Sequence, residues 1–122
     1  MMVLRLYADG NGESHFDTQE IAMSLQEFAP PAAPIYVSEP QAASRFVLIE
    51  LPVAWGGGQP HPTPSRHMMF CLSGSFKITA SDGESREFSI GDALLMADTN
   101  GKGHTTTVTS GQPATVLMIR LE

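Results

Sequence analysis

Apolar and polar residues alternate in short runs along most of this chain, and turn-forming residues separate the runs. A period of two places successive side chains on opposite faces of a β-strand. The pattern is clearest over 76–80, where three apolar residues alternate with Lys77 and Thr79, and Asp82-Gly83 then supplies the positive-φ positions of a hairpin turn. This rhythm predicts an all-β fold.

Strands are predicted wherever such a run lies between turn signals. The run 46–51 is apolar at almost every position, which predicts a strand buried on both faces for part of its length. The segment 20–28 fits both a strand and a helical face, and we favour a strand because prolines follow it. In the second strand of this hairpin, Phe88 and Ile90 occupy alternate positions, so both side chains are predicted to point inward. The other predicted strands cover 3–7, 68–72, 76–80, 86–90, 93–97, 104–109 and 114–121.

The composition fits one ordinary globular domain. The chain has 122 residues, of which 42% are hydrophobic and 16% are charged, enough for one core without disulfides. Its net charge of −6, without any cluster of Lys and Arg, makes nucleic acid and anionic membranes poor partners, so we expect a small molecule or a second copy of the chain. The single Cys71 and the lack of a signal-like or long apolar segment predict a cytoplasmic protein.

Three of the four histidines lie in the region of predicted strands and form the candidate site. His61, Thr63 and His67 share strand parity, so an extended segment would present all three on one inward face. The connection 56–64 is rich in Gly and Pro, which favour extended backbone over helix. His104 follows a polar loop and begins another predicted strand. Neutral imidazoles from separate strands are common ligands of divalent metals.

Two motifs in this region resemble those of the cupin superfamily. Counting back from Gly74 in Leu72-Ser73-Gly74-Ser75-Phe76, the first motif places His67 at the family's glutamate position, His61 at its first histidine and Thr63 at its second. The second motif begins Gly-Asp and ends in a histidine, and is similar to the stretch from Gly91-Asp92 to His104. The resemblance covers about 46–120. Thr63 and His67 replace usual ligands, the second motif is about two residues longer than usual, and Ala97 stands near its usual proline.

This resemblance implies a single domain, 1–122, with a cupin-type double-stranded β-helix, a jelly-roll barrel of antiparallel strands with its core at about 46–120. Residues 1–45 are expected to add strands at an edge. The pairing of an N-terminal strand with a second subunit in such small proteins implies a homodimer, and an unpaired edge strand also favours dimerisation on physical grounds. The resemblance further implies that His61, His67 and His104 bind a divalent metal, with open positions for water and substrate.

The leading functional hypothesis is therefore a metal-dependent enzyme that acts on an unidentified small molecule. Three-histidine proteins of the superfamily suggest oxidative cleavage by a dioxygenase, and isomerase chemistry fits the residues equally well. The ion would be Fe, Zn, Mn or Ni, and it would polarise a substrate oxygen or activate dioxygen. The alternatives are a non-catalytic protein that binds a small ligand, and a structural dimer without metal whose cavity is filled by Met and aromatic side chains.

Four further residues are candidates for contact with the metal shell or the substrate. Thr63 is expected behind a metal-bound water. Arg66 is a candidate partner of a substrate carboxylate or of Asp98, although a structural ion pair is the favoured role. Asp98 and Lys102 lie in the loop expected at the mouth of the barrel, where simple solvation is the alternative. Metal binding is not the only possible role of each histidine. It could instead be a structural residue, exposed or hydrogen-bonded to the backbone, or it could carry protons without a metal.

Overall fold

The computed structural model describes residues 1–56 and 58–122, so Gly57 of the predicted Gly- and Pro-rich connection lies outside the described part of the chain. All the regular secondary structure in the described part of the chain is β-strand, as the alternation predicts. The strands are β1 (Met2–Ala8), β2 (Ser14–Glu20), β3 (Ser24–Gln26), β4 (Ile35–Val37), β5 (Ala43–Leu51), β6 (His67–Ser73), β7 (Phe76–Ala80), β8 (Ser85–Phe88), β9 (Ala93–Ala97), β10 (His104–Val108) and β11 (Ala114–Leu121). Over these residues no helix is long and apolar enough to cross a membrane.

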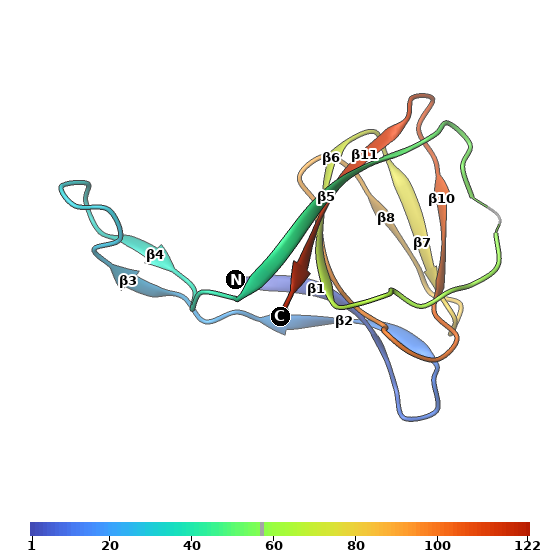
Figure 1. Cartoon of the computed structure of the whole chain (residues 1–122), viewed down its shortest axis with the longest axis horizontal. Helices are drawn as coiled ribbons and strands as arrows, with labels where there is room; N and C mark the ends of the chain where they lie inside the picture. Colours follow the sequence, from blue (N-terminus) through green and yellow to red (C-terminus); the bar gives the residue numbers. More distant parts are fainter. Residues whose placement is uncertain (57) are drawn as a thin grey trace.

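Two sheets form the body of the molecule, and a hairpin projects from it (Figure 1). The larger sheet has the order β2-β1-β9-β6-β11-β5, and the smaller has the order β10-β7-β8. β3 and β4 pair only with each other and form the projecting arm, residues 24–37. β1 and β9 run parallel, with Arg5 opposite Leu95, whereas the other neighbours are antiparallel.

The all-β prediction is confirmed, but two parts of the predicted architecture are corrected. The described strands form separate sheets and not one closed barrel, and the parallel pair β1–β9 makes the larger sheet mixed. A cupin jelly roll of antiparallel strands is therefore not confirmed. The predicted hairpin is confirmed between β7 and β8, where Gly83 has a φ of 95° and donates its N–H to the Ala80 carbonyl at 3.0 Å.

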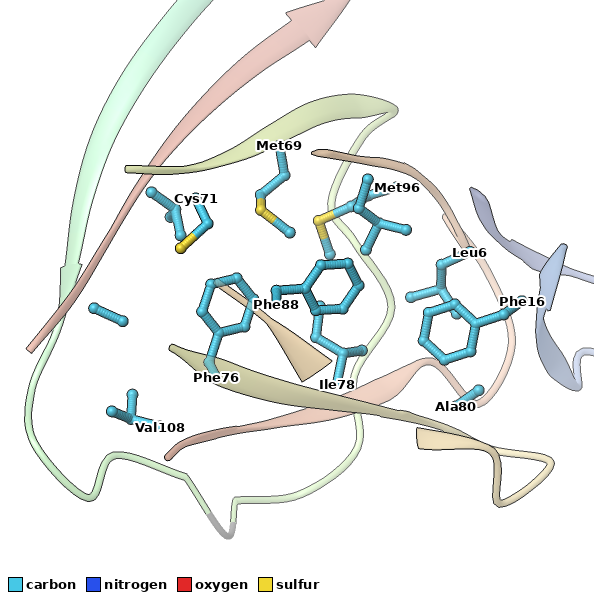
Figure 2. Close-up of a cluster of buried hydrophobic side chains, with 13 residues drawn as sticks. Leu6, Phe16, Met69, Cys71, Phe76, Ile78, Ala80, Phe88, Met96 and Val108 are labelled. Atoms are coloured by element: carbon cyan, nitrogen blue, oxygen red, sulfur yellow. The ribbon is translucent and has the colours of Figure 1, made fainter. Parts of the chain in front are cut away.

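One apolar core fills the space between the two sheets (Figure 2). The rings of Phe76 and Phe88, from the smaller sheet, stack with their centroids 5.5 Å apart. Side chains of the larger sheet point toward them, namely Met69, Cys71 and Met96, and Leu6 and Phe16 close one end of the core. Burial raises the pKa of the Cys71 thiol, which disfavours the reactive thiolate.

Two predictions of burial are wrong. β5 is the edge strand of the larger sheet, and its Phe46 and Leu48 are 72% and 61% exposed on the single chain, although the apolar run predicts burial on both faces. Ile90 was assigned to the inward face by parity, but it is also 72% exposed. The reason is that β8 ends at Phe88, so the alternation no longer applies at Ile90.

An ion-pair cluster ties the loop after β1 to the β7–β8 turn. In His15 of β2, Nε2 lies 2.7 Å from Oδ2 of Asp9 and Nδ1 lies 2.8 Å from Oδ2 of Asp82. Hydrogen bonds with Asp9 and then Asp82 raise the pKa of His15 above its ordinary value. The pKa of Asp9 is lowered chiefly by His15, and that of Asp82 chiefly by the Glu84 N–H and then by His15. The cluster therefore favours a protonated imidazole.

The core assignment predicts very different costs for truncating Phe88, the last residue of β8, and Ile90, which lies two residues beyond the strand. Phe88→Ala should lower the free energy of unfolding by about 3 to 5 kcal/mol, because it removes a buried aromatic ring. Ile90→Ala, the exposed control, should change it by less than about 0.5 kcal/mol. Denaturant unfolding followed by circular dichroism measures both values. Equal costs for the two variants would contradict the placement of the core.

The His15 cluster predicts a pH-dependent contribution to stability. A raised folded-state pKa means that the stabilisation is complete below the ordinary histidine pKa of 6.5 and is lost as the pH rises through the folded value. The difference in free energy of unfolding between the wild type and His15→Gln should therefore be largest at weakly acidic pH and shrink above neutrality. Urea unfolding between about pH 5 and pH 9 tests this. A difference that stays constant over this range would show that the two ion pairs do not stabilise the fold.

Candidate functional site

A cavity of about 190 Å³ lies between the two sheets beside the core. Its wall is mainly apolar, and three methionines contribute flexible side chains to it. Strands of both sheets and the connection between β5 and β6 supply the lining, which consists of Ile49, Leu51, Trp55, His61, Thr63, Pro64, Met69, Phe76, Ile78, Met96, His104, Thr106, Val116 and Met118. An apolar cavity with few polar groups is the usual form of a site for a small molecule.

Two of the predicted site residues, His61 and His104, lie side by side at this cavity. An isolated antiparallel bridge joins them, in which each backbone N–H donates to the carbonyl of the other, at 3.1 and 3.0 Å. Their ring centroids are 5.0 Å apart. His104 is buried at the start of β10, whereas His61 is exposed in the connection before β6. The two imidazoles therefore extend from the interior toward the surface.

A buried carboxylate, Asp98, holds His104 in place. It follows β9, is fully buried, and accepts a hydrogen bond at each side-chain oxygen. Oδ1 accepts from the Thr63 hydroxyl at 2.7 Å, and Oδ2 accepts from Nδ1 of His104 at 2.6 Å. The Thr63 N–H also donates to the Asp98 carbonyl at 3.0 Å. Because both carboxylate oxygens and the backbone are engaged, Asp98 has little freedom to turn away from His104.

These contacts fix the tautomers of both histidines. Nδ1 of His104 faces a carboxylate and Nδ1 of His61 faces the Gln59 carbonyl at 3.2 Å, so Nδ1 is the donor in each ring. Nε2 then carries the lone pair of each neutral imidazole. Within the described residues, every fully buried side-chain nitrogen or oxygen has a hydrogen-bond partner. Nε2 of His104 makes no hydrogen bond to these residues, so this atom is not fully buried. This basic nitrogen is therefore accessible from the cavity that His104 lines.

A close backbone approach brings the two histidine-bearing segments together. Gly103 has a φ of 74°, and a Cβ at this position would lie 2.0 Å from the carbonyl carbon of His61. Only glycine allows this approach and this conformation without a shift of the backbone. The Gly103 carbonyl accepts from the hydroxyl of the fully buried Ser14 at 2.7 Å, and Ser14 in turn bonds to Ser81. The site is thereby connected to β2 and to the β7–β8 turn.

The remaining predicted residues lie elsewhere. His67 begins β6, does not line the cavity, and donates from Nδ1 to the Ser65 carbonyl at 2.6 Å. Arg66 lines a hollow on the outer face of the larger sheet. The exposed Lys102 pairs with Glu13 at 2.6 Å, and this hydrogen bond raises the pKa of Lys102.

The arrangement does not fit the predicted three-histidine metal site. The described part of the chain contains no group of three or more His, Cys, Asp or Glu side chains placed to hold a metal ion. His61 and His104 come together without His67, and both oxygens of Asp98 are already hydrogen-bonded. The Thr63 hydroxyl donates to the Asp98 carboxylate at 2.7 Å and so supports it.

Two features of the site go beyond the prediction. Asp98 is a predicted candidate, but its burial is not predicted, although Leu94, Met96 and Asp98 share one parity and the first two are apolar, a signal for an inward carboxylate. The three cavity methionines, Met69, Met96 and Met118, have no role in the predicted site. No local signal identifies Ser14, whose partners are 67 and 89 residues away in sequence.

Three solved structures are similar to this chain. The polyketide cyclase RemF from Streptomyces resistomycificus aligns with a TM-score of 0.51 and 26% identity over 65% of this chain and 56% of its own. A conserved protein of unknown function from Streptococcus pyogenes aligns with a TM-score of 0.46 and 20% identity, over 70% of this chain and 69% of its own. A protein from Neisseria meningitidis aligns with a TM-score of 0.47 and 20% identity, over 69% of this chain and 84% of its own. This chain thus matches little more than half the length of the cyclase.

No protein-family model matches the chain, and no curated protein matches it. These comparisons contradict the predicted membership of the cupin superfamily, because no family model matches the chain and the similar structure RemF is described as a polyketide cyclase. The motifs that suggested the family are mostly turn glycines. Such glycines occur wherever short strands are joined by tight turns, so they have little power to identify a family.

The close approach at Gly103 predicts a large effect of a single methyl group. Gly103→Ala should lower the free energy of unfolding by about 1 to 2 kcal/mol from the left-handed backbone alone, and by more from the contact with His61. Gly111→Ala is the matched control, because nothing lies within 4 Å of its added Cβ and its φ is not in the left-handed region. Thermal or urea unfolding measures both. A Gly103→Ala protein as stable as the Gly111→Ala protein would contradict the described contact between the segments.

Proposed function

We propose that this protein is an acid–base enzyme of the cyclase or isomerase type, acting on an apolar small molecule that carries two carbonyl groups. The observation that carries the proposal is the Asp98–His104 pair, whose basic nitrogen is accessible from an apolar cavity. A histidine oriented by a buried carboxylate is a frequent general base, because the carboxylate stabilises the imidazolium that forms.

In the proposed reaction, Nε2 of His104 removes a proton from the carbon beside one carbonyl group, in a substrate whose second carbonyl group lies far enough along the chain for ring closure. The electron pair of the broken C–H bond forms an enolate, and the Asp98 carboxylate stabilises the positive charge on His104. The enolate carbon then attacks the second carbonyl and forms a carbon–carbon bond. The imidazolium returns its proton to the new alkoxide oxygen. The net change is a ring closure in which one proton moves from carbon to oxygen, so no further reactant is needed.

The isomerase version uses the same first step. His104 removes a proton from one carbon of the substrate and returns it to another, which moves a double bond. In both versions His61 is a positioning residue, because its Nε2 accepts a hydrogen bond from an enol or product hydroxyl at the mouth of the cavity. The 5.0 Å between the ring centroids allows one substrate to contact both imidazoles.

The size and wall of the cavity indicate the kind of substrate. A volume of about 190 Å³ holds one ring or a short folded chain, since an apolar cavity of about 150 Å³ is known to admit benzene. Trp55 lies at the wall, and its carbonyl accepts from the Val108 N–H at 2.8 Å, which ties this loop to β10. The methionines adapt to flat or irregular apolar shapes. The likeness to the polyketide cyclase RemF supports a substrate of this class.

The proposal predicts catalysed hydrogen exchange at carbon. Benzoylacetone, a phenyl-substituted 1,3-diketone, serves as the probe, and its exchange of the acidic C–H proton with deuterated water is followed by NMR at low buffer concentration. The wild type should accelerate the exchange. His104→Gln and Asp98→Asn should each lower the catalysed rate by about 10²- to 10⁴-fold, the usual contribution of a general base.

The matched control is His67→Gln, which removes a histidine that does not line the cavity and should leave the exchange rate unchanged. A loss of activity in His67→Gln equal to that in His104→Gln would overturn the proposal and favour a site built from three histidines. Binding of the probe without any exchange would overturn catalysis of this type and favour a ligand-binding protein. Circular dichroism of each variant shows that a lost rate does not reflect unfolding.

A further inference from the structure

The larger sheet has two apolar faces, of which the chain itself covers only one. Met69, Val116 and Met118 face the core and the cavity, so the alternating positions of β6 and β11 lie on the opposite face. The strand register places these outer residues in two rows across neighbouring strands. The first row is Phe46, Ile119, Met68 and Leu95, and the second is Leu48, Leu117 and Phe70. We call these seven residues the outer face.

The outer face is hollowed where the arm joins the body. A hollow of about 560 Å³ has an apolar wall from Met68, Phe70, Leu95 and Ile119 of the outer face, and a partly polar wall from the segments that lead into and out of the arm, residues 19–22, 38–39 and 41. A second hollow, of about 390 Å³, lies over β5 and β11 beside Phe46. Concave apolar surfaces of this extent on a single chain indicate an interaction site.

The arm lacks a partner of its own. β3 and β4 pair only with each other, and Figure 1 shows the hairpin extending away from both sheets. Its apolar side chains are exposed, namely Leu25, Phe28, Ile35 and Tyr36. A two-stranded hairpin is at best marginally stable in water without a surface to pack on. The arm therefore indicates a contact with another molecule.

Charge and area favour a second copy of the same chain as that molecule. Residues 6–44, which include the arm, contain no Lys or Arg, whereas Arg45 lines the smaller hollow, whose lining contains no carboxylate, and forms no ion pair within the described residues. Glu27 of the arm is complementary to this arginine. The exposed parts of the four arm side chains and of Phe46 and Leu48 amount to roughly 800 Å² per chain, which is about the contribution of one partner to a stable interface.

We propose that two copies form a homodimer in which the arm of each chain packs on the outer face of the other. Each chain carries both the arm and the surface for it, so a two-fold axis generates two identical contacts and closes the assembly. The six-stranded sheet then becomes covered on both faces. This contact explains why the run 46–51 has the sequence of a strand buried on both faces and yet is exposed on the single chain.

The proposal is tested by sedimentation equilibrium across micromolar concentrations. The wild type should have twice the 13.1 kDa mass of the chain. Phe28→Asp in the arm and Phe46→Asp in the outer face should each raise the dimer Kd by about thirtyfold or more, the effect of losing a central apolar anchor. Ile90→Asp is the matched control, because Ile90 is as exposed as Phe46 but belongs to neither surface, and this variant should remain dimeric.

Mixing the two monomeric variants provides the decisive measurement. Phe28→Asp retains an intact outer face and Phe46→Asp retains an intact arm, so the mixture should form a heterodimer with one undamaged contact, whereas each variant alone has none. A monomeric wild type would overturn the proposal and leave the outer face to a different partner. A dimer that resists both substitutions, or a mixture that stays monomeric, would also overturn it. Circular dichroism confirms that each variant is folded.

Discussion

The site depends on the need to satisfy one buried carboxylate. Asp98 is fully excluded from solvent, and an isolated buried charge would be too costly for the fold to tolerate. Its two hydrogen bonds draw together parts of the chain that are otherwise separate, because Thr63 belongs to the connection before β6 and His104 begins β10. The bridge between His61 and His104 then follows, since Thr63 cannot reach Asp98 unless the preceding backbone lies against β10. Gly103 makes this approach sterically feasible. The geometry of the imidazoles is thus a consequence of where the carboxylate is buried.

The sequence predicts the strands from β5 onward well because alternation is a local property, but it does not predict β2 or β4. The hairpin at Asp82-Gly83 and the strands that contain 76–80 and 93–97 are recovered from residue order alone. The parallel pairing of β1 with β9 is not, because it joins segments about ninety residues apart through their backbones. For the same reason local alternation cannot distinguish two separate sheets from a closed barrel. The motif resemblance misled the fold assignment because its turns are common to many chains of short strands.

His67 does not line the cavity with His61 and His104, and there is a specific physical reason for this. Counting parity from His61 to His67 assumes one continuous strand, but β6 begins only at His67 and the segment 61–63 pairs with the region of Asp98 and His104 instead. Pro62 lies within the first segment and Pro64 directly after it, and both remove backbone donors that a continuous strand would need. His61 and His104 could be linked from the sequence because each borders a strand region. The role of Asp98 depends on its burial, which is a tertiary property.

The cavity and the proposed dimer share the larger sheet, and this connects them energetically. Met69 and Met118 line the cavity from one face of β6 and β11, and Met68 and Ile119, their neighbours in sequence, lie on the outer face. A strand that is covered on one side only can shift more easily than one packed on both, because fewer contacts oppose its displacement. Coverage of the outer face by a second copy would therefore hold the floor of the cavity in place, opposite the Asp98–His104 pair. A general base acts efficiently only when the substrate is held at the right distance. A rigid cavity floor would therefore favour the proposed chemistry, although the partner chain contributes no residue to the site.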